Sequence, residues 1–347
     1  MRDRFISPER PLRRKESVRF MHTLALGAAF AVTIPVVPLW ALELGLPAQC
    51  TLGADCFVQQ FPDMDPGPDA VDPFCGSATY EGHDGLDLRV LSMKDVARGV
   101  PVLAMADGVV LRSRDGEPDR LVVSESDRAG VASRECGNGV VIEHGDGVET
   151  QYCHMKQGSL VVQPGDAMRK GQPIGQIGAS GLAQFPHVHV SLRRDGVALD
   201  PVTGRAIGGG CEGGDATDIA IGHPHADLIG RGETQLLAFG LAGAPIDHAA
   251  LAVSGPPPVA VRASPALVGW AWMQNLQQGD RISIEVIDPA GSAFATGTTD
   301  PMDRSKATYS SFAGKRGSPT AGDYAVTVEL LRNGRAIIER TASYRVE

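Results

Sequence analysis

The chain has 347 residues, of which 43% are hydrophobic and 21% charged, so a packed core is expected and disorder along the whole chain is excluded. Its 42 glycines and 24 prolines, with only 5% aromatic residues, favour turn-rich β-structure over a coiled coil or a helical bundle. The net charge is −9, yet residues 1–20 carry a balance of +4, which leaves −13 for the rest of the chain. Such an acidic body argues against a nucleic-acid partner.

The first predicted element is a leader, in which the basic start is followed by an uncharged apolar stretch over residues 24–41. This order is typical of a secretory signal peptide, with Leu39-Trp40-Ala41 as the cleavage site. We therefore predict a signal peptide over residues 1–41, export to the periplasm or the extracellular space, and no stable membrane insertion after cleavage. An uncleaved N-terminal anchor is the alternative, because about 18 apolar residues just span a bilayer. Pro35 and Pro38 would interrupt such a helix.

An even number of cysteines follows the leader, which in an exported chain indicates disulfide bonds. Two are close enough to close a small loop, and two others lie on the arms of a predicted hairpin. A zinc site made only of cysteines is the alternative, but the sequence contains no C-x-x-C pair. Six cysteines allow 15 pairings, and the sequence alone does not choose among them. The two candidate local pairs are Cys50 with Cys56 and Cys136 with Cys153, and the remaining cysteines are Cys75 and Cys211.

The rest of the chain divides into four segments by composition and periodicity. Residues 42–75 form a Cys/Pro-rich lead-in segment with little periodicity. Residues 76–204 contain short β-runs separated by glycine turns, including a hairpin that turns at residues 145–147. Residues 205–250 are a Gly-rich linker or surface excursion. Residues 251–347 predict a β-sandwich accessory domain that ends in a hairpin turning at Asn333-Gly334.

One strand of the predicted sandwich contains Trp270 and Trp272, which share a strand face because residues i and i+2 point the same way. Packing within the sandwich is the favoured interpretation. Stacking of the two rings on a sugar ligand is the alternative.

Histidine and aspartate residues that could bind a metal ion occur together in three short stretches of the β-rich segment. His83 and Asp87 are separated by three residues, one of them Gly85, so a bent turn can bring both side chains to one cation. His187 and His189 flank a single valine in an apolar run, so both imidazoles project from the same face of a strand. The third stretch ends at His154, on the second arm of the predicted hairpin.

Imidazole nitrogens and carboxylate oxygens are ligands that suit zinc. Three protein ligands with one open position are typical of a catalytic zinc site, and imidazoles left without metal could move a proton or stabilise an oxyanion. These patterns alone do not distinguish the metal-binding imidazoles from the others. No H-E-x-x-H is present, which excludes a thermolysin-like site.

The segment from Gly82 to Pro201 resembles the lysostaphin/LytM-type zinc metalloendopeptidases. It contains their H-x-G-x-D pattern at residues 83–87 and an A-x-x-D-G-V-V turn at residues 104–110. The block G-N-G-V-V-I-E-H-G-D-G-V-E-T-Q-Y-C-H follows at residues 137–154, and the last matching motif is P-H-V-H at residues 186–189. A lipoyl-like hairpin lies between these blocks. The resemblance covers a little over a third of the chain.

This resemblance implies an all-β fold with an antiparallel β-sheet cleft of the duplicated hybrid motif, lipoyl-like type, followed here by the C-terminal β-sandwich. It implies His83, Asp87 and His189 as ligands of one Zn²⁺ per chain, with His154 and His187 as unligated catalytic imidazoles. Ser191 departs from the family pattern, because many relatives have an acidic residue at that position.

The expected function is therefore that of an exported zinc metalloendopeptidase, a peptide bond hydrolase that acts on peptidoglycan cross-links or stem peptides through a zinc-activated water. A non-catalytic LytM-like regulator of another cell-wall hydrolase is one alternative, and an endopeptidase acting on proteins is another. The sequence predicts no oligomeric state, and neither the bond that is cut nor a ligand of the sandwich can be derived from it.

Overall fold

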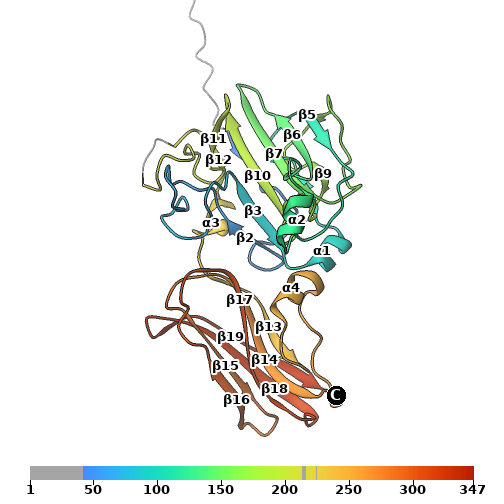
Figure 1. Ribbon diagram of the computed structural model, residues 1–347, viewed down its shortest axis with the longest axis vertical. Coiled ribbons are helices and arrows are strands. Elements are labelled where there is room, and N and C mark those ends of the chain that lie inside the picture. The colour runs from blue at the N-terminus through green and yellow to red at the C-terminus, as the bar shows by residue number, and fades with distance from the viewer. Residues whose placement is uncertain (1–41, 213–215, 224) are drawn as a thin grey trace, which may run out of the picture. The chain divides into compact units, whose positions relative to one another are not determined.

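The structure, a computed structural model, describes residues 42–212, 216–223 and 225–347 (Figure 1). This part of the chain is mostly β, which confirms the predicted all-β fold class. Among the described residues, no helix is both long and apolar enough to span a membrane. The predicted signal peptide, residues 1–41, lies outside the described residues.

The largest sheet is antiparallel and has eight strands, and Figure 1 shows its central strands side by side. The predicted hairpin is present in it as β6 and β7, with Val140 opposite Tyr152. The strand order is β2 (Cys56–Gln60), β3 (Leu86–Val90), β10 (His187–Arg194), β7 (Val148–Met155), β6 (Asn138–Glu143), β5 (Gly108–Arg114) and β8 (Ala167–Met168), with β11 (Val197–Leu199) paired to β10.

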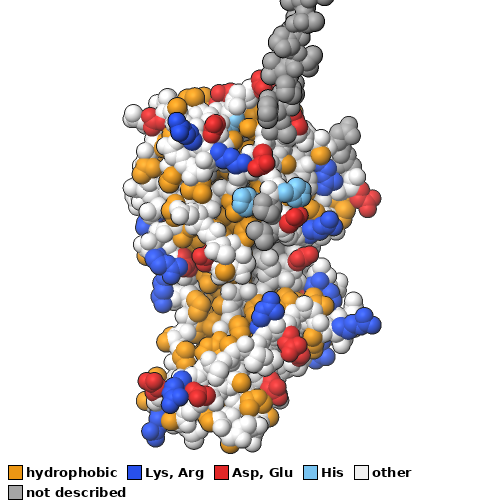
Figure 2. Space-filling view, turned by 180° about the vertical axis from the view of Figure 1, so that it is seen from behind, with side chains coloured by type: hydrophobic (Ala, Val, Ile, Leu, Met, Phe, Trp, Pro, Cys, Tyr) orange, Lys and Arg blue, Asp and Glu red, His pale blue; other side chains and the backbone are white. Residues whose placement is uncertain are grey.

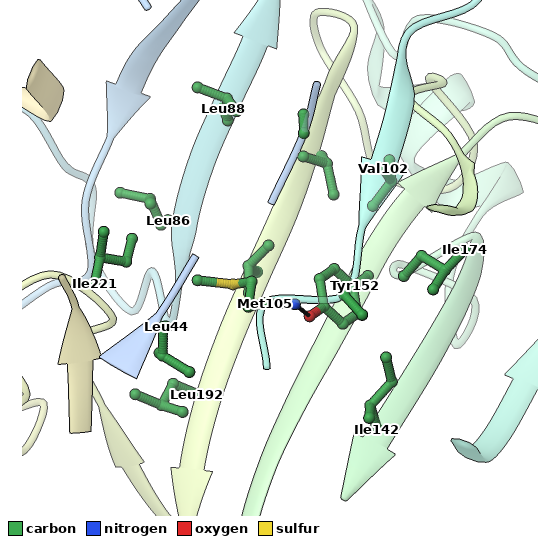
Figure 3. Close-up of a cluster of buried hydrophobic side chains, with 14 of the residues drawn as sticks. Leu44, Leu86, Leu88, Val102, Met105, Ile142, Tyr152, Ile174, Leu192 and Ile221 are labelled. Atoms are coloured by element: carbon green, nitrogen blue, oxygen red, sulfur yellow. Dashed lines mark hydrogen bonds between the residues drawn. The ribbon is translucent and has the colours of Figure 1, made fainter. Parts of the chain in front are cut away.

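Alternation along the central strands separates an apolar face of this sheet from a polar one. Leu86 and Leu88 of β3, Leu192 of β10 and Tyr152 of β7 point to the apolar face and are at most 1% exposed (Figure 3). The Tyr152 hydroxyl accepts a hydrogen bond from the backbone N–H of Met105 at 2.8 Å, which satisfies its polar end. Burial of each large side chain stabilises the fold by about 1.5–3 kcal/mol. Asp87 of β3 and His187 and His189 of β10 alternate with these side chains and therefore occupy the opposite face.

The lead-in segment is more regular than expected. It contributes β1 (Leu42–Leu44), which pairs in parallel with β12 (Ile219–Ile221), and β2, which forms one edge of the large sheet. The short apolar run Cys56-Phe57-Val58 has no visible period, but β3 supplies the partner that orders it. The remaining short elements are β4 (Pro101–Leu103) paired with β9 (Pro173–Gln176), and the helices α1 (Met93–Arg98), α2 (Glu125–Gly130) and α3 (His225–Ile229).

All six cysteines form disulfides, as the even count predicted. Cys50–Cys56 and Cys136–Cys153 are the two local pairs that the sequence suggested. The third bond, Cys75–Cys211, joins residues 136 positions apart and ties the lead-in to the segment that follows the large sheet.

The C-terminal part is a β-sandwich of a three-stranded and a four-stranded antiparallel sheet. Its last turn is the predicted one, because Asn333 and Gly334 both have positive φ, 51° and 76°, as a two-residue hairpin requires. The strands are β13 (Gln235–Ala242), β14 (Ala266–Leu276) and β17 (Lys306–Arg316) in one sheet, and β16 (Ala293–Thr298), β15 (Arg281–Ile287), β18 (Gly322–Arg332) and β19 (Arg335–Val346) in the other.

The first strand of the sandwich, β13, lies within residues 205–250, which were expected to be a linker. The apolar run of β13 is hidden in a glycine-rich composition, and only its pairing with β14 makes it a strand. The helix α4 (His248–Ser254) follows it. The sandwich therefore begins at Gln235 rather than near residue 251.

Strand β14 is buried on both faces. Leu267, Ala271 and Met273 face the core between the two sheets. Trp270 and Trp272 point the other way, into a separate apolar cluster that also contains Phe57 of β2, and each is only 2% exposed. The two indoles thus pack against the large-sheet part of the chain and are not exposed for stacking on a sugar.

Charged side chains of both signs are interspersed over the face drawn in Figure 2. Ion pairs among the described residues include Lys170 with Glu43 at 3.0 Å and Arg134 with Glu117 at 3.0 Å. Exposed pairs of this kind contribute about 0–1 kcal/mol each. The fold therefore depends on its apolar clusters and disulfides more than on surface charge.

Candidate metal centre

Three predicted ligands meet on the polar face of the large sheet. Asp87 of β3 lies directly opposite His189 of β10, and His83 precedes β3 in a turn. His83 Nε2 is 3.2 Å from Asp87 Oδ1 and 3.1 Å from His189 Nδ1, while Asp87 Oδ1 is 2.8 Å from His189 Nδ1. All three side chains are buried, so their polar atoms must satisfy one another or a common cation.

Each of the two histidines is oriented by a hydrogen bond on its other ring nitrogen. His83 Nδ1 donates to the carbonyl oxygen of Phe61 at 2.6 Å, which leaves the lone pair of Nε2 toward the centre. His189 Nε2 lies 3.1 Å from Ser191 Oγ and 3.3 Å from Asp84 Oδ1, which leaves Nδ1 toward the centre. Outer contacts of this kind fix the tautomer and ring orientation of metal-binding histidines.

The charge state of the cluster follows from its burial and its neighbours. Burial disfavours the carboxylate of Asp87, but His83, His187 and His189 outweigh this effect and hold its pKa well below the usual range. Burial also disfavours the imidazolium of His189, yet hydrogen bonds to Asp84 and Asp87 raise its pKa to about 9. A cation that binds Nδ1 of His189 must displace the proton on that nitrogen, so metal affinity should fall as the pH falls.

Two further imidazoles, those of His154 and His187, lie beside the three candidate ligands. Their ring centroids are 4.6 Å apart, and His154 is 6.1 Å from the ring of His189. His154 Nδ1 is 2.8 Å from the carbonyl oxygen of Ser180, and His187 Nδ1 is 2.7 Å from that of Phe185. A carbonyl oxygen only accepts hydrogen bonds, so Nδ1 carries the proton in both rings and Nε2 has the lone pair.

Both of these imidazoles are held in the neutral form. Burial is the main cause that lowers the pKa of His154 well below its ordinary value, and nearby histidines act in the same direction. Burial also lowers the pKa of His187, although Asp87 opposes the shift. Each Nε2 is therefore available as a proton acceptor at neutral pH.

The backbone of His154 has an unusual conformation, with φ at +60°. A non-glycine residue adopts this region only where its surroundings hold it, at a cost of about 1–3 kcal/mol. Here the N–H of His154 donates to the carbonyl oxygen of Cys136 at 2.8 Å, next to the Cys136–Cys153 disulfide. The ring is held from the other side by Ser180.

Ser180 is part of the support of His154. Its side chain is fully buried, accepts the N–H of Asn138 at 2.9 Å and donates to the carbonyl oxygen of Met155 at 2.7 Å. Sequence reasoning did not identify this role, because the backbone carbonyl of Ser180, rather than its side chain, is the group that contacts His154.

The centre opens into a cleft with polar walls. One part of the cleft is lined by Tyr80, Asp84, Glu135 and Arg193, and the adjoining part by Arg128 of α2. Tyr80 stacks on the imidazole of His83, with centroids 4.6 Å apart and planes inclined by 30°. Sequence reasoning missed these wall residues, because they come from separate parts of the chain: Tyr80, Asp84 and Glu135 from turns and loops, Arg128 from α2 and Arg193 from β10. All five predicted site residues are nevertheless brought together in one place.

Comparison with known proteins matches the region of the chain that contains the five candidate site residues. Residues 81–201 match Peptidase family M23. The chain is 32% identical over 126 residues to the DD-carboxypeptidase/endopeptidase Mpg of Neisseria meningitidis serogroup B, covering 36% of this chain and 23% of that protein. It is 32% identical over 94 residues to the peptidoglycan DD-endopeptidase ShyA of Vibrio cholerae, covering 27% and 17% respectively. The matched region thus spans less than a quarter of the length of these curated relatives.

Among solved structures, a zinc-containing peptidase from Vibrio cholerae aligns with a TM-score of 0.31 and 20% identity, over 50% of this chain and 41% of that one.

Proposed function

Residues 81–201 form a peptidase M23 domain, and from this premise we propose that the protein is an exported zinc metalloendopeptidase that cleaves peptide bonds in peptidoglycan cross-links or stem peptides. The observation that supports this most directly is the buried His83–Asp87–His189 triangle with two neutral imidazoles beside it. In this proposal residues 76–204 are the catalytic domain and the sandwich is an accessory domain.

The donor set and its spacing fit one zinc ion. Zinc binds histidine nitrogen and carboxylate oxygen at about 2.0–2.2 Å in tetrahedral geometry, which places ligand atoms about 3.3 Å apart. The three donor atoms are 2.8–3.2 Å apart, close to that spacing. Zinc in this position would supply a Lewis acid that activates water at neutral pH. A fourth, structural ligand is not needed, since a catalytic site keeps one position open.

The two imidazoles account for proton movement in this proposal. Because backbone carbonyls hold the proton on Nδ1 of both rings, Nε2 of His154 or His187 can accept a proton from the attacking water. The imidazolium formed can then stabilise negative charge on the substrate carbonyl or return the proton to the leaving amine. Neither residue needs to bind the metal for this role.

The polar walls of the cleft are consistent with a peptide substrate. Glu135 can pair with an ammonium group and Arg128 with a carboxylate, whereas Asp84 and Arg193 already pair with each other at 3.0 Å. Stem and cross-link peptides of peptidoglycan offer both kinds of group. The names of the matched relatives point to the same substrate class, since one is a DD-carboxypeptidase/endopeptidase and another a peptidoglycan DD-endopeptidase.

Incubation with purified cross-linked peptidoglycan tests the proposal, with released fragments identified by mass. The expected result is a loss of cross-linked fragments, which a zinc chelator prevents and added zinc restores. A parallel incubation with an unfolded protein substrate separates the two peptidase alternatives. Stoichiometric zinc without cleavage of either substrate would contradict the proposal and favour a regulatory role.

A further inference from the structure

Arg89 is a buried cation on the same face of the sheet as the candidate metal centre. It lies two residues beyond Asp87 in β3 and directly opposite His187 in β10. Its side chain is only 1% exposed. The guanidinium donates to the side chain of Gln59 and to the carbonyl oxygens of Val90 and Leu91, so its polar contacts are all with uncharged oxygens.

Two aromatic rings pack on this guanidinium. The Arg89 Cζ atom is 5.2 Å from the centroid of Phe185 and 4.8 Å from that of Trp272. Both distances are within the range in which a cation is attracted to the face of an aromatic ring. Trp272 comes from β14 of the C-terminal sandwich, where it is 2% exposed. Arg89 therefore joins the sandwich to the loop that precedes β10.

Phe185 in turn holds His187 in two ways. The two rings are stacked, with centroids 4.4 Å apart and planes inclined by 29°. The carbonyl oxygen of Phe185 also accepts the Nδ1–H of His187 at 2.7 Å. Together these contacts fix the ring plane, the tautomer and the direction of Nε2, which lies 3.6 Å from Asp87 Oδ1.

We infer that Arg89 and Trp272 are positioning residues for His187, and that the C-terminal sandwich completes the active site through the stack Trp272–Arg89–Phe185–His187. This inference rests on the proposed catalytic function of His187. Without the Trp272 ring, the Arg89 guanidinium loses one of its two aromatic partners and no longer holds the Phe185 ring in place. The His187 ring that stacks on Phe185 then samples other orientations. Misplacement of a catalytic group by about 1 Å can lower the rate on the order of 100-fold.

The chain offers a matched control for this stack. Trp270 lies on the same strand and the same face as Trp272, with the same exposure and in the same apolar cluster. Only Trp272 is within cation–π distance of Arg89. Trp270→Leu and Trp272→Leu therefore remove similar buried area, but only the second interrupts the stack. Trp272→Phe retains a ring and serves as the conservative variant.

The test uses the full zinc-loaded chain and three measurements: zinc per chain, kcat and KM on a cross-linked peptidoglycan fragment, and the ring proton shifts of His187 by NMR with labelled histidine. Trp272→Leu should keep its zinc and KM, lose about tenfold or more in kcat, and shift the His187 ring protons because the stacked Phe185 moves. Trp270→Leu should change neither kcat nor those shifts. Trp272→Phe should retain most of the wild-type kcat and His187 ring proton shifts close to those of the wild type.

Equal losses in the two leucine variants, or unchanged His187 shifts in Trp272→Leu, would overturn the inference and reduce the stack to interface packing. If Trp272→Leu does not fold, Phe185→Leu at the half-buried middle ring should give the same shift and the same loss of kcat, and unchanged values there would also overturn it. Failure of the proposed function is distinguishable, because the wild-type chain would then show no turnover while the His187 shifts still respond to the Trp272 variants.

Discussion

Gly85 lies directly against the imidazole of His189. A Cβ atom added to Gly85 would be 2.6 Å from His189 Nε2 and 2.5 Å from the carbonyl oxygen of Val190, closer than real Cβ contacts. The glycine in the His83–Asp87 turn is therefore required by the close approach of β10, which leaves no room for a side chain.

Gly85→Ala should displace His189 and lower zinc occupancy, because either the imidazole or the β10 backbone has to move. Zinc per chain after dialysis against a weak chelator measures this directly. Gly130→Ala is the matched control, since its added Cβ would meet only the end of the Arg120 side chain, at 3.6 Å. Full zinc occupancy in Gly85→Ala would show that β10 adapts at no cost to the site.

The Cys136–Cys153 disulfide should support activity through His154. The carbonyl oxygen of Cys136 accepts the backbone N–H of His154, and Cys153 precedes His154 in the chain. Replacing both cysteines with serine should lower kcat by about tenfold or more while zinc is retained.

The control is the same double replacement at Cys50 and Cys56, a pair that closes a short loop in the lead-in. Unchanged kcat in the Cys136/Cys153 variant would contradict this role.

A related measurement is thiol titration of the denatured, unreduced protein, which should detect almost no thiol because all six cysteines are paired.

Ser191 should contribute to zinc affinity although it does not contact the metal position. Its hydroxyl lies 3.1 Å from His189 Nε2, the nitrogen that faces away from the centre. Removing such an outer contact typically weakens metal binding by about 10–100-fold. Competition with a chelator should show this loss for Ser191→Ala and not for Ser283→Ala in the sandwich. Equal affinities would mean that Asp84 alone orients His189.

The pH profile should reflect the lowered pKa values of His154 and His187. Burial lowers both below the ordinary value of 6.5, and a bound cation nearby acts in the same direction. The neutral, proton-accepting form therefore persists below pH 6.5. With zinc in excess, kcat/KM should change little from about pH 8 to about pH 6.5 and decline only at lower pH. A half-maximal value near pH 6.5 would show that an unperturbed imidazole controls the rate.

Much of the candidate site could be predicted because its patterns are local. The i, i+2 spacing of His187 and His189 places both imidazoles on one face of a strand, and the turn around Gly85 places His83 near Asp87. The hairpin that precedes His154 is likewise fixed by its glycines.

The supports of the site could not be predicted in the same way. Arg89, Phe185 and Trp272 are far apart in the sequence, and only the folded chain brings them into one stack. The pairing of Cys75 with Cys211 is one of many that the count allows. Strand β13 was missed because its identity depends on its partner β14 rather than on its own composition.

The central claim is that three side chains hold zinc while two imidazoles perform proton transfer. Metal content and peptidoglycan hydrolysis, measured together for alanine variants at each of the five positions, test this claim most directly. His83→Ala, Asp87→Ala and His189→Ala should lose zinc and activity together. His154→Ala and His187→Ala should keep one zinc per chain and lose about 10²–10³ in rate. Loss of zinc in His187→Ala with retention in His189→Ala would contradict the assignment of ligands.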